Sequence, residues 1–389
     1  MLSPQAAPVV RATLPVVGAH IEEIAQVFYR RLFAAHPELL RDLFNRGNQH
    51  SGEQQKALAG SLATFATLLL DQPEARPDAV LARIAHKHVS LGVTPAQYEV
   101  VHTHLFAAIG EVLGEAVTPE VAAAWDEVYW LMAHALIALE QDLYARGGGR
   151  VWRPMEITGR RDEGEGAVSF TLRRVDGEPA GSFRPGQYVS VRTALPDGAH
   201  QIRQYSLASA PGEKEWRITV RRDGEVSGHL HGTARVGHVL DVSMPCGDVG
   251  LDEGAGGPLL LASAGIGVTP MLSMLGSLAA SGSGRPVLAL HADRSPAHHA
   301  HREEQAELVA ALAGAELVTW YEDGAEGAAS RAGRIESLDG LDVREGVTAY
   351  LCGPVPFMRG VRGLLLERGV PAADIHYEVF GPDLGLDVR

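Results

Sequence analysis

Apolar residues recur every three or four positions along the first 147 residues, which is the spacing of a buried helix face. Two of these stripes are Ile21, Ile24, Phe28, Leu32 and Leu58, Leu62, Phe65, Leu69. Helix starts are marked by a hydroxyl residue followed by proline, at Ser3-Pro4, Thr94-Pro95 and Thr118-Pro119. The pattern predicts about six helices and no strand in this part of the chain, and so an all-α domain.

Three glycines, Gly147-Gly148-Gly149, end this pattern, and residues that alternate between apolar and polar follow. Val168–Leu172, Tyr188–Val191 and Trp216–Val220 alternate in the way that half-buried strands do. Turn residues such as Pro211-Gly212 separate the strands, and no helical crossover is visible. Residues 151–256 are therefore predicted to form a small antiparallel β-barrel.

Beyond Gly257, short apolar strands alternate with helical stretches, as in a domain with a parallel sheet. The first strand, Leu259–Ala262, runs into Gly265-Ile266-Gly267-Val268-Thr269-Pro270. Glycines let a backbone approach a pyrophosphate, and a helix that begins at Pro270 offers free N–H groups and a positive dipole. The loop matches neither the Gly-x-Gly-x-x-Gly nor the Walker pattern. Residues 257–389 are predicted to form an α/β domain that binds a nucleotide at this loop.

Three polar side chains lie on apolar helix faces of the first domain. His88 follows Leu81 by seven positions and Ile84 by four, so it faces inward. Glu140 and Tyr98 also occupy apolar stripes, where a carboxylate or a phenol needs a hydrogen-bonding partner. A metal-bound imidazole donates its free N–H to such partners. The alternatives are a satisfied core histidine at 88 and partly exposed helix edges at 98 and 140.

Composition and charge narrow the function. The chain has 389 residues, 46% of them apolar and 21% charged, which suits two or three soluble globular domains. The formal net charge of −14 argues against nucleic acid and anionic membranes as partners. Cys246 and Cys352 are too few for a disulfide framework, and neither a signal peptide nor a membrane-spanning stretch is visible. A cytoplasmic protein is expected.

Several helical segments closely resemble the globin domain of flavohaemoglobins. These segments are Phe28–Phe33, His36–Leu39, Leu43–Asn45, Asn48-Gln49, Ala85–His88 and Pro95–Tyr98. The resemblance implies that His88 is the proximal ligand of a haem iron. It also implies that Tyr98 and Glu140 are the hydrogen-bonding partners of this histidine.

On the other side of the haem, the resemblance makes Tyr29 and Gln54 the residues that contact the oxygen ligand. Phe44 matches the aromatic wedge against the haem, and Leu58 matches the distal apolar residue. Each has a simpler alternative, since Tyr29 and Phe44 also suit an ordinary core. Gln54 stands three residues after Ser51 and could instead close a capping box.

The predicted barrel carries Arg203-Gln204-Tyr205-Ser206. An arginine suits a pyrophosphate, a tyrosine offers a flat face to a flavin ring, and a serine hydroxyl reaches a ring nitrogen. The motif resembles the Arg-x-Tyr-Ser signature of the ferredoxin-reductase superfamily and implies that these four residues hold FAD. Gly224, Val226 and Ser227 resemble its second, phosphate-facing flavin loop, and Tyr188 resembles a flavohaemoglobin tyrosine near the flavin. The alternative is a polar surface strand.

Two later segments resemble parts of the same family. Cys352-Gly353-Pro354 resembles the turn beside the nicotinamide, and Phe380-Gly381-Pro382 resembles the segment that lays an aromatic ring near the flavin. The alternative for Cys352 is a small buried hydrophobic residue at a strand end. Asp293 and Arg294 leave the choice between NADH and NADPH open, since one suits a ribose hydroxyl and the other a 2′-phosphate.

Over nearly the whole chain the resemblance implies a flavohaemoglobin, with a globin at 1–147, an FAD-binding barrel at 151–256 and an NAD(P)H-binding domain at 257–389. It implies haem b with one iron, FAD, and NADH or NADPH as cofactors. The implied activity is nitric oxide dioxygenation, with nitric oxide and dioxygen as substrates, and a monomer is expected. Two alternatives stay open: an oxygen-binding or sensing haemoprotein with a haem reductase, and a flavin reductase with a structural helical domain.

Overall fold

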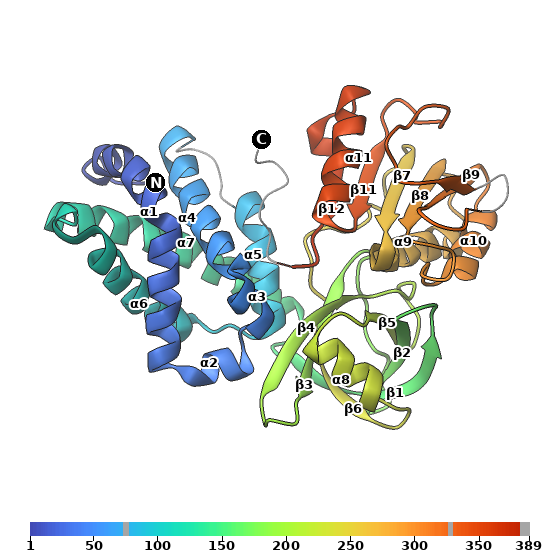
Figure 1. The fold of residues 1–389 in the computed structure, drawn as a ribbon, viewed down its shortest axis with the longest axis horizontal. Helices are drawn as coiled ribbons and strands as arrows, with labels where there is room; N and C mark the ends of the chain where they lie inside the picture. The colour runs from blue at the N-terminus through green and yellow to red at the C-terminus, as the bar shows by residue number, and fades with distance from the viewer. Residues whose placement is uncertain (73–77, 326–329, 382–389) are drawn as a thin grey trace. The chain divides into compact units, whose positions relative to one another are not determined.

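The computed structural model describes residues 1–72, 78–325 and 330–381 (Figure 1). By contacts between residues these form two compact units. The first comprises Met1–Trp152 together with Arg192–Ile202, and the second comprises Arg153–Val191 and Arg203–Gly381. The domain boundaries expected from the sequence stay a prediction. Within the described ranges, no helix is long and apolar enough to cross a membrane.

The first unit is helical. Its α-helices are α1 (Ala6–Ala35), α2 (Pro37–Asp42), α3 (Arg46–Ser51), α4 (Glu53–Asp71), α5 (Asp78–Leu91), α6 (Pro95–Leu113) and α7 (Pro119–Arg146). A short 3₁₀ turn, Gly114–Ala116, separates α6 from α7. These are seven helices in the described residues, where about six were expected. The difference arises because α2 and α3 have only six residues each and show no periodic stripe.

Two of the three helices that were expected to begin at a proline after a hydroxyl residue do so. Pro95 and Pro119 are the first residues of α6 and α7, and the Thr118 hydroxyl accepts a hydrogen bond from the Val121 N–H at 3.3 Å. Gln97 closes the capping box of α6 by accepting from the Thr94 N–H at 2.8 Å. Helix α1 begins at Ala6 and not at Pro4, but the Ser3 hydroxyl caps this start as expected, since it accepts from the Ala6 N–H at 3.1 Å.

Helix α1 forms the centre of the helical core. Its stripe of Ile24, Phe28 and Leu32 is fully buried and packs among α4, α6 and α7. From α4, Leu62 and Phe65 join the same core. Helix α5 packs against α7, which brings the faces that carry His88 and Glu140 together.

The first sheet is antiparallel in the pairings of β1 with β2 and of β2 with β5. Its strands are β1 (Trp152–Asp162), β2 (Ala167–Arg174), β3 (Tyr188–Ala194), β4 (His200–Ser206), β5 (Trp216–Arg221) and β6 (Val239–Ser243). They are ordered β4-β3-β6-β1-β2-β5, and a bridge between Leu207 and Ile218 joins the two edge strands, which closes the barrel. Helix α8 (Glu225–Thr233) connects β5 to β6 (Figure 1), so the expectation of no helix here was wrong.

The second sheet is parallel, as the α/β pattern predicts. Its strands are β7 (Leu259–Ala264), β8 (Val287–Asp293), β9 (Ala315–Tyr321), β10 (Ser330–Ala332), β11 (Thr348–Cys352) and β12 (Ile375–Glu378). Helices α9 (Val268–Ala280), α10 (Arg302–Ala310) and α11 (Val355–Glu367) connect them. The order β10-β9-β8-β7-β11-β12 reverses direction between β7 and β11. Such a switch point, at the carboxyl ends of the strands, is where open α/β sheets bind ligands.

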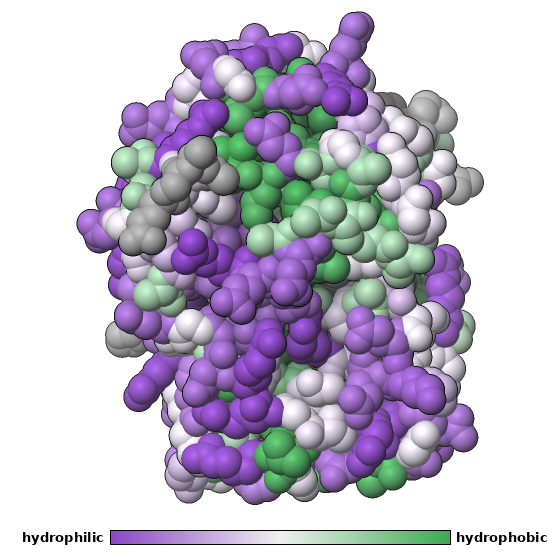
Figure 2. Space-filling view, turned by 90° about the vertical axis from the view of Figure 1, so that its right-hand side faces the viewer, coloured by the Kyte–Doolittle hydropathy of each residue, from purple (hydrophilic) through white to green (hydrophobic). Residues whose placement is uncertain are grey.

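The surface of the molecule is mixed in character. Figure 2 shows one face, on which hydrophilic residues cover most of the lower part and hydrophobic residues gather in the upper part. Large apolar side chains that are exposed elsewhere, such as Val236, Val239 and Leu366, occur one by one. Isolated exposed apolar residues are normal for a folded protein and carry no functional signal.

Within the second unit, charged side chains join the barrel to the α/β layer. Arg217 on β5 donates to the carboxylate of Glu304 on α10, and the His301 imidazole lies 3.0 Å from the same carboxylate. Burial raises the pKa of Glu304, but the hydrogen bonds from His301 and Arg217 outweigh it and lower the pKa to about 2. The carboxylate is therefore ionised at neutral pH and fully paired.

This pairing predicts an acid-dependent loss of stability. Because the folded pKa of Glu304 lies below its ordinary value of 4.5, its contribution is present above that pH and is lost as the pH falls toward 2. Glu304→Gln should lower the free energy of unfolding by about 2 kcal/mol near neutral pH and by much less near pH 3. Glu303→Gln, on the exposed side of the same helix, is the control and should have little effect at either pH. Urea denaturation of the three proteins at both pH values measures this, and an equal loss for Glu304→Gln at both would contradict it.

Candidate functional site

His88, Tyr98 and Glu140 meet although they come from three different helices. The His88 Nδ1–H donates to Glu140 Oε1 at 2.8 Å, and the Tyr98 hydroxyl donates to the same oxygen at 2.5 Å. Glu140 is 2% exposed, whereas the side chain of His88 keeps 30% of its surface open. Burial, followed by the charge of Glu140, raises the pKa of Tyr98, so its phenol stays protonated and donates.

This geometry fixes the tautomer of His88. With Nδ1 committed to a buried carboxylate, Nε2 is the nitrogen that presents a lone pair. A single imidazole is the one protein ligand that a haem iron would need, so the donor set fits a haem. The Tyr129 hydroxyl extends the arrangement by donating to the Tyr98 carbonyl at 2.6 Å.

The expected distal residues lie on α1, on the segment after α2, and on α4. Tyr29 is 5% exposed, and its ring lies 5.8 Å from that of Phe44 in an edge-on arrangement. Phe33 contacts both rings, and Leu58 packs against the same core. Gln54 lies in the first turn of α4, with its side chain outside the described part. Ser51 ends α3 and Gly52 precedes α4, and the capping-box alternative for Gln54 stays untested because it concerns side chains outside the described part.

The flavin motif Arg203–Ser206 forms the end of β4, beside β3 with Tyr188. The Ser206 hydroxyl is buried and has no hydrogen-bond partner in the described protein. A buried hydroxyl without a partner is costly, and a ring nitrogen of a flavin would satisfy it. Burial also raises the pKa of Tyr205, and Gln204 Nε2 donates to the Ser190 hydroxyl at 2.9 Å. These residues fit an isoalloxazine ring.

The second flavin segment is the start of a helix and not a loop. Gly224 is the N-cap of α8, and Val226 is buried in its first turn. The Ser227 hydroxyl accepts from the N–H groups of Asp223 and Gly224, both at 2.9 Å. Because its hydroxyl is occupied, the segment offers a phosphate the remaining N–H groups of the helix N-terminus.

Both nucleotide loops lie at the switch point of the parallel sheet. Gly265–Gly267 forms a 3₁₀ turn after β7, and α9 begins at Val268, two residues before the expected Pro270. A Cβ on Gly267 would lie 2.2 Å from the Cys352 carbonyl oxygen, so the two loops touch through this glycine. The Thr269 hydroxyl donates to the Ile266 carbonyl at 2.9 Å, which tightens the turn.

The Cys352-Gly353-Pro354 turn follows β11. Cys352 is fully buried and its thiol pKa is raised by burial, so it is a neutral residue and not a thiolate. Pro354 is the N-cap of α11. Phe380 is 48% exposed, and Gly381 follows it in a conformation with φ of 150°. Pro382 lies outside the described residues.

The structure adds a residue that sequence reasoning missed. Arg221, at the end of β5, approaches the loop after β7, since a Cβ on Gly265 would lie 3.3 Å from its guanidinium. An arginine beside a phosphate loop suits a pyrophosphate. Asp293 Oδ1 accepts from the Arg294 N–H at 2.7 Å, whereas Oδ2 lies 3.5 Å from His291 Nε2 and is buried without a hydrogen-bond partner in the described residues. The ribose contact considered for Asp293 stays a prediction.

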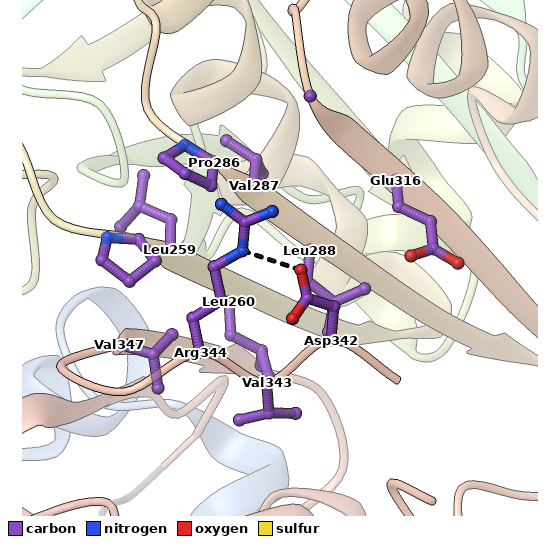
Figure 3. Close-up of a pocket in the computed structure, with 12 residues that line it drawn as sticks. Leu259, Leu260, Pro286, Val287, Leu288, Glu316, Asp342, Val343, Arg344 and Val347 are labelled. Carbon is purple, nitrogen blue, oxygen red and sulfur yellow. Dashed lines mark hydrogen bonds and ion pairs between the residues drawn. The ribbon is translucent and has the colours of Figure 1, made fainter. Parts of the chain in front are cut away.

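A surface pocket lies at the opposite edge of the parallel sheet, at the amino ends of its strands (Figure 3). Its lining includes Leu259, Val287 and Val347, together with Arg344, which donates to Asp342 at 2.7 Å. None of the predicted cofactor residues lines it. The switch-point loops and not this pocket are the candidate nucleotide site.

Fold and site together define a globin joined to a flavin- and nicotinamide-dependent reductase. A globin family model matches residues 26–136, and an oxidoreductase NAD-binding domain model matches residues 261–363. A flavohemoprotein of Bordetella parapertussis is 43% identical, covering 98% of this chain and 99% of its own. The chain belongs to the flavohemoprotein family and is an oxidoreductase.

Solved structures agree with this assignment. A flavohemoglobin from Malassezia yamatoensis with bound FAD and heme is 38% identical, with a TM-score of 0.91 over 98% of this chain and 100% of that one. The flavohem-like FAD/NAD binding domain of nitric oxide dioxygenase from Vibrio cholerae is 35% identical, with a TM-score of 0.57 over 60% of this chain and 100% of that one.

The contact between the two nucleotide loops predicts that position 267 tolerates no side chain. Gly267→Ala should lower the free energy of unfolding by at least about 2 kcal/mol, because the methyl group meets rigid backbone at Cys352 and Gly353. Gly360→Ala, on α11 with open space around it, is the matched control and should be neutral or stabilising by about 0.5–1 kcal/mol. Chemical denaturation measures both. Equal stability of the two variants would show that the loops are not packed as described.

Proposed function

We propose that this protein is an NAD(P)H-dependent nitric oxide dioxygenase that holds haem b and FAD and converts nitric oxide and dioxygen to nitrate. Bound FAD would turn a two-electron hydride donor into single electrons, and bound haem would supply the iron at which the two gases react. The relative with bound FAD and heme supports the cofactors, and the nitric oxide dioxygenase relative supports the reaction. A cytoplasmic location and a monomeric state stay predictions from the sequence.

The observation that carries the proposal is the buried carboxylate behind His88. Glu140 accepts hydrogen bonds from both His88 and Tyr98, and its carboxylate draws the Nδ1 proton away from the imidazole. An imidazole with this partner is a stronger electron donor at Nε2. His88 would thereby supply a bound haem iron with the electron density that reduction of dioxygen needs.

The remaining residues have roles that follow from their places. His88 would hold the iron, Phe44 and Leu58 would pack against the haem, and Tyr29 and Gln54 would donate to the oxygen ligand. Arg203, Gln204, Tyr205 and Ser206 would hold the flavin, with Tyr188 beside it and the N-terminus of α8 at its phosphates.

The nicotinamide coenzyme would lie at the switch point of the parallel sheet. The loop from Gly265 to Pro270 would bind the pyrophosphate, helped by Arg221 from the barrel. The turn from Cys352 to Pro354 would border the nicotinamide, and its neutral, buried thiol adds no charge there. The coenzyme is NADH or NADPH, since Asp293 suits a ribose hydroxyl and the neighbouring Arg294 suits a 2′-phosphate.

Nitric oxide turnover by the holoprotein tests the proposal. In air-saturated buffer, nitric oxide should accelerate NAD(P)H oxidation and should be recovered as nitrate, about two per coenzyme, because a hydride carries two electrons. A nitric oxide electrode and ion chromatography give both quantities. Slow nitric oxide consumption without nitrate would favour the oxygen-binding or sensing alternative, and a protein without a Soret band would favour the flavin reductase.

A histidine pair on α5 provides the control. His88→Ala should abolish the Soret band and nitrate formation, while the flavin absorbance and the reduction of ferricyanide by NAD(P)H persist. His86→Ala, two residues earlier on the same helix, should retain both haem and nitrate formation. An intact Soret band in His88→Ala would show that the iron is held elsewhere.

A further inference from the structure

The loop between β8 and α10 brings a buried histidine against the barrel. The side chain of His301 is 0% exposed. Its Nδ1 lies 3.0 Å from the Glu304 carboxylate and 3.3 Å from the Glu163 carboxylate. Its Nε2 is 2.8 Å from the Thr219 hydroxyl. Glu304 belongs to the α/β layer, whereas Glu163 and Thr219 belong to the barrel, so one imidazole joins both.

The groups around His301 form a charge network, which we call the clasp. Its members are Arg161, Glu163, Ser169, Arg217, Thr219, His301 and Glu304. Arg161 donates two hydrogen bonds to Glu163, at 2.7 and 2.9 Å, and the Ser169 hydroxyl donates a third at 2.5 Å. Arg217 donates to Glu304 from the barrel side. Removing one partner from such a buried network leaves an uncompensated charge, so its geometry is strongly specified.

The backbone at His301 is held in an unfavourable conformation. His301 has a φ of 58° and is the one non-glycine residue with positive φ in the described structure. A non-glycine residue in this region costs free energy and persists only where its surroundings determine it. The three hydrogen-bonding contacts of the imidazole hold the backbone in this conformation.

Backbone packing at the same place brings the two layers into direct contact. The Glu165 N–H, in the turn between β1 and β2, donates to the Ala297 carbonyl at 2.8 Å. A Cβ on Gly164 would lie 2.6 Å from that carbonyl oxygen, so a side chain there would separate the layers. The clasp therefore acts where the barrel and the loop 294–301 touch most closely.

The clasp is coupled to the cofactor sites through β5. Thr219 contacts His301, and Arg221, two residues later on the same face of the strand, approaches the loop at Gly265. Hydride transfer requires reacting atoms about 3–3.5 Å apart, and a misplacement of 1 Å costs about 100-fold in rate. Fixing β5 against the α/β layer fixes the flavin residues of the barrel relative to the nicotinamide loops.

We infer that His301 is a positioning residue for hydride transfer, which holds the flavin-binding barrel in register with the nicotinamide-binding layer through the clasp. The inference rests on the proposed transfer from NAD(P)H to FAD. It assigns His301 no contact with either cofactor. Its effect is on the geometry of the reactive complex and not on the affinity or potential of the flavin.

The test is anaerobic stopped-flow reduction of the flavin by NADH and NADPH in the holoprotein, with rates expressed per bound flavin. His301→Gly removes the imidazole and relieves the positive φ, which favours a folded variant. We expect the limiting rate of flavin reduction to fall at least about tenfold. The coenzyme concentration at half-saturation, the flavin midpoint potential and the Soret band should stay close to wild type.

The matched control is His298→Gly in the same loop. The side chain of His298 is 25% exposed, and its ring lies 2.8 Å from the Ser295 hydroxyl and 3.3 Å from the carboxylate of Glu165, which is 68% exposed, so its loss should cost far less than the loss of the buried His301 ring. The rate in His298→Gly should stay within about twofold of wild type. An unchanged rate per bound flavin in His301→Gly would overturn the inference, as would equal effects of the two variants.

A milder substitution covers the case in which His301→Gly loses its flavin or fails to fold. Glu163→Gln keeps the shape of the clasp and removes its barrel charge, so it should slow flavin reduction in the same way. A normal rate in Glu163→Gln would then overturn the inference. If neither coenzyme reduces the wild-type flavin, the proposed function fails. Hydrogen exchange still tests the clasp, because His301→Gly or Glu163→Gln should increase exchange in residues 163–165 and 294–301.

Discussion

The hydrogen bond from His88 to the buried carboxylate of Glu140 is the interaction on which the function of this protein depends. It requires α5 and α7 to pack closely, and it requires Tyr98 on α6 to donate to the same oxygen. A 2% exposed carboxylate without these two donors would be strongly destabilising. In the proposed function, this packing presents Nε2 of an electron-rich imidazole to the haem iron.

In the proposed function, the second unit brings two flat ring systems close together, the flavin and the nicotinamide. The parallel sheet reverses its order between β7 and β11, and the two loops that leave these strands touch at Gly267. The barrel offers an unsatisfied Ser206 hydroxyl for a flavin. Close backbone contacts at Gly164 and at Gly267 bring these surfaces together. The helical unit thus depends on hydrogen bonds to a buried carboxylate, whereas the second unit depends on close backbone contacts.

Much of this was readable from the sequence. Helical spacing placed His88, Tyr98 and Glu140 on inward faces, and local motifs marked the strands and the nucleotide loops. The helix α8 was missed because its first turn is also a flavin motif and its nine residues are short. The clasp at His301 depends on contacts between residues far apart in the chain, which periodicity does not encode. The strained backbone at His301 left no local signal either.

The most direct test of this account is the iron–histidine stretching band of the ferrous holoprotein, measured by resonance Raman spectroscopy in wild type and Glu140→Gln. Glutamine keeps the shape of the side chain but removes the charge that draws the Nδ1 proton from His88. The account predicts that the band moves to lower wavenumber in Glu140→Gln while the haem content is unchanged. A band at the same wavenumber in both proteins would show that Glu140 does not control the proximal ligand.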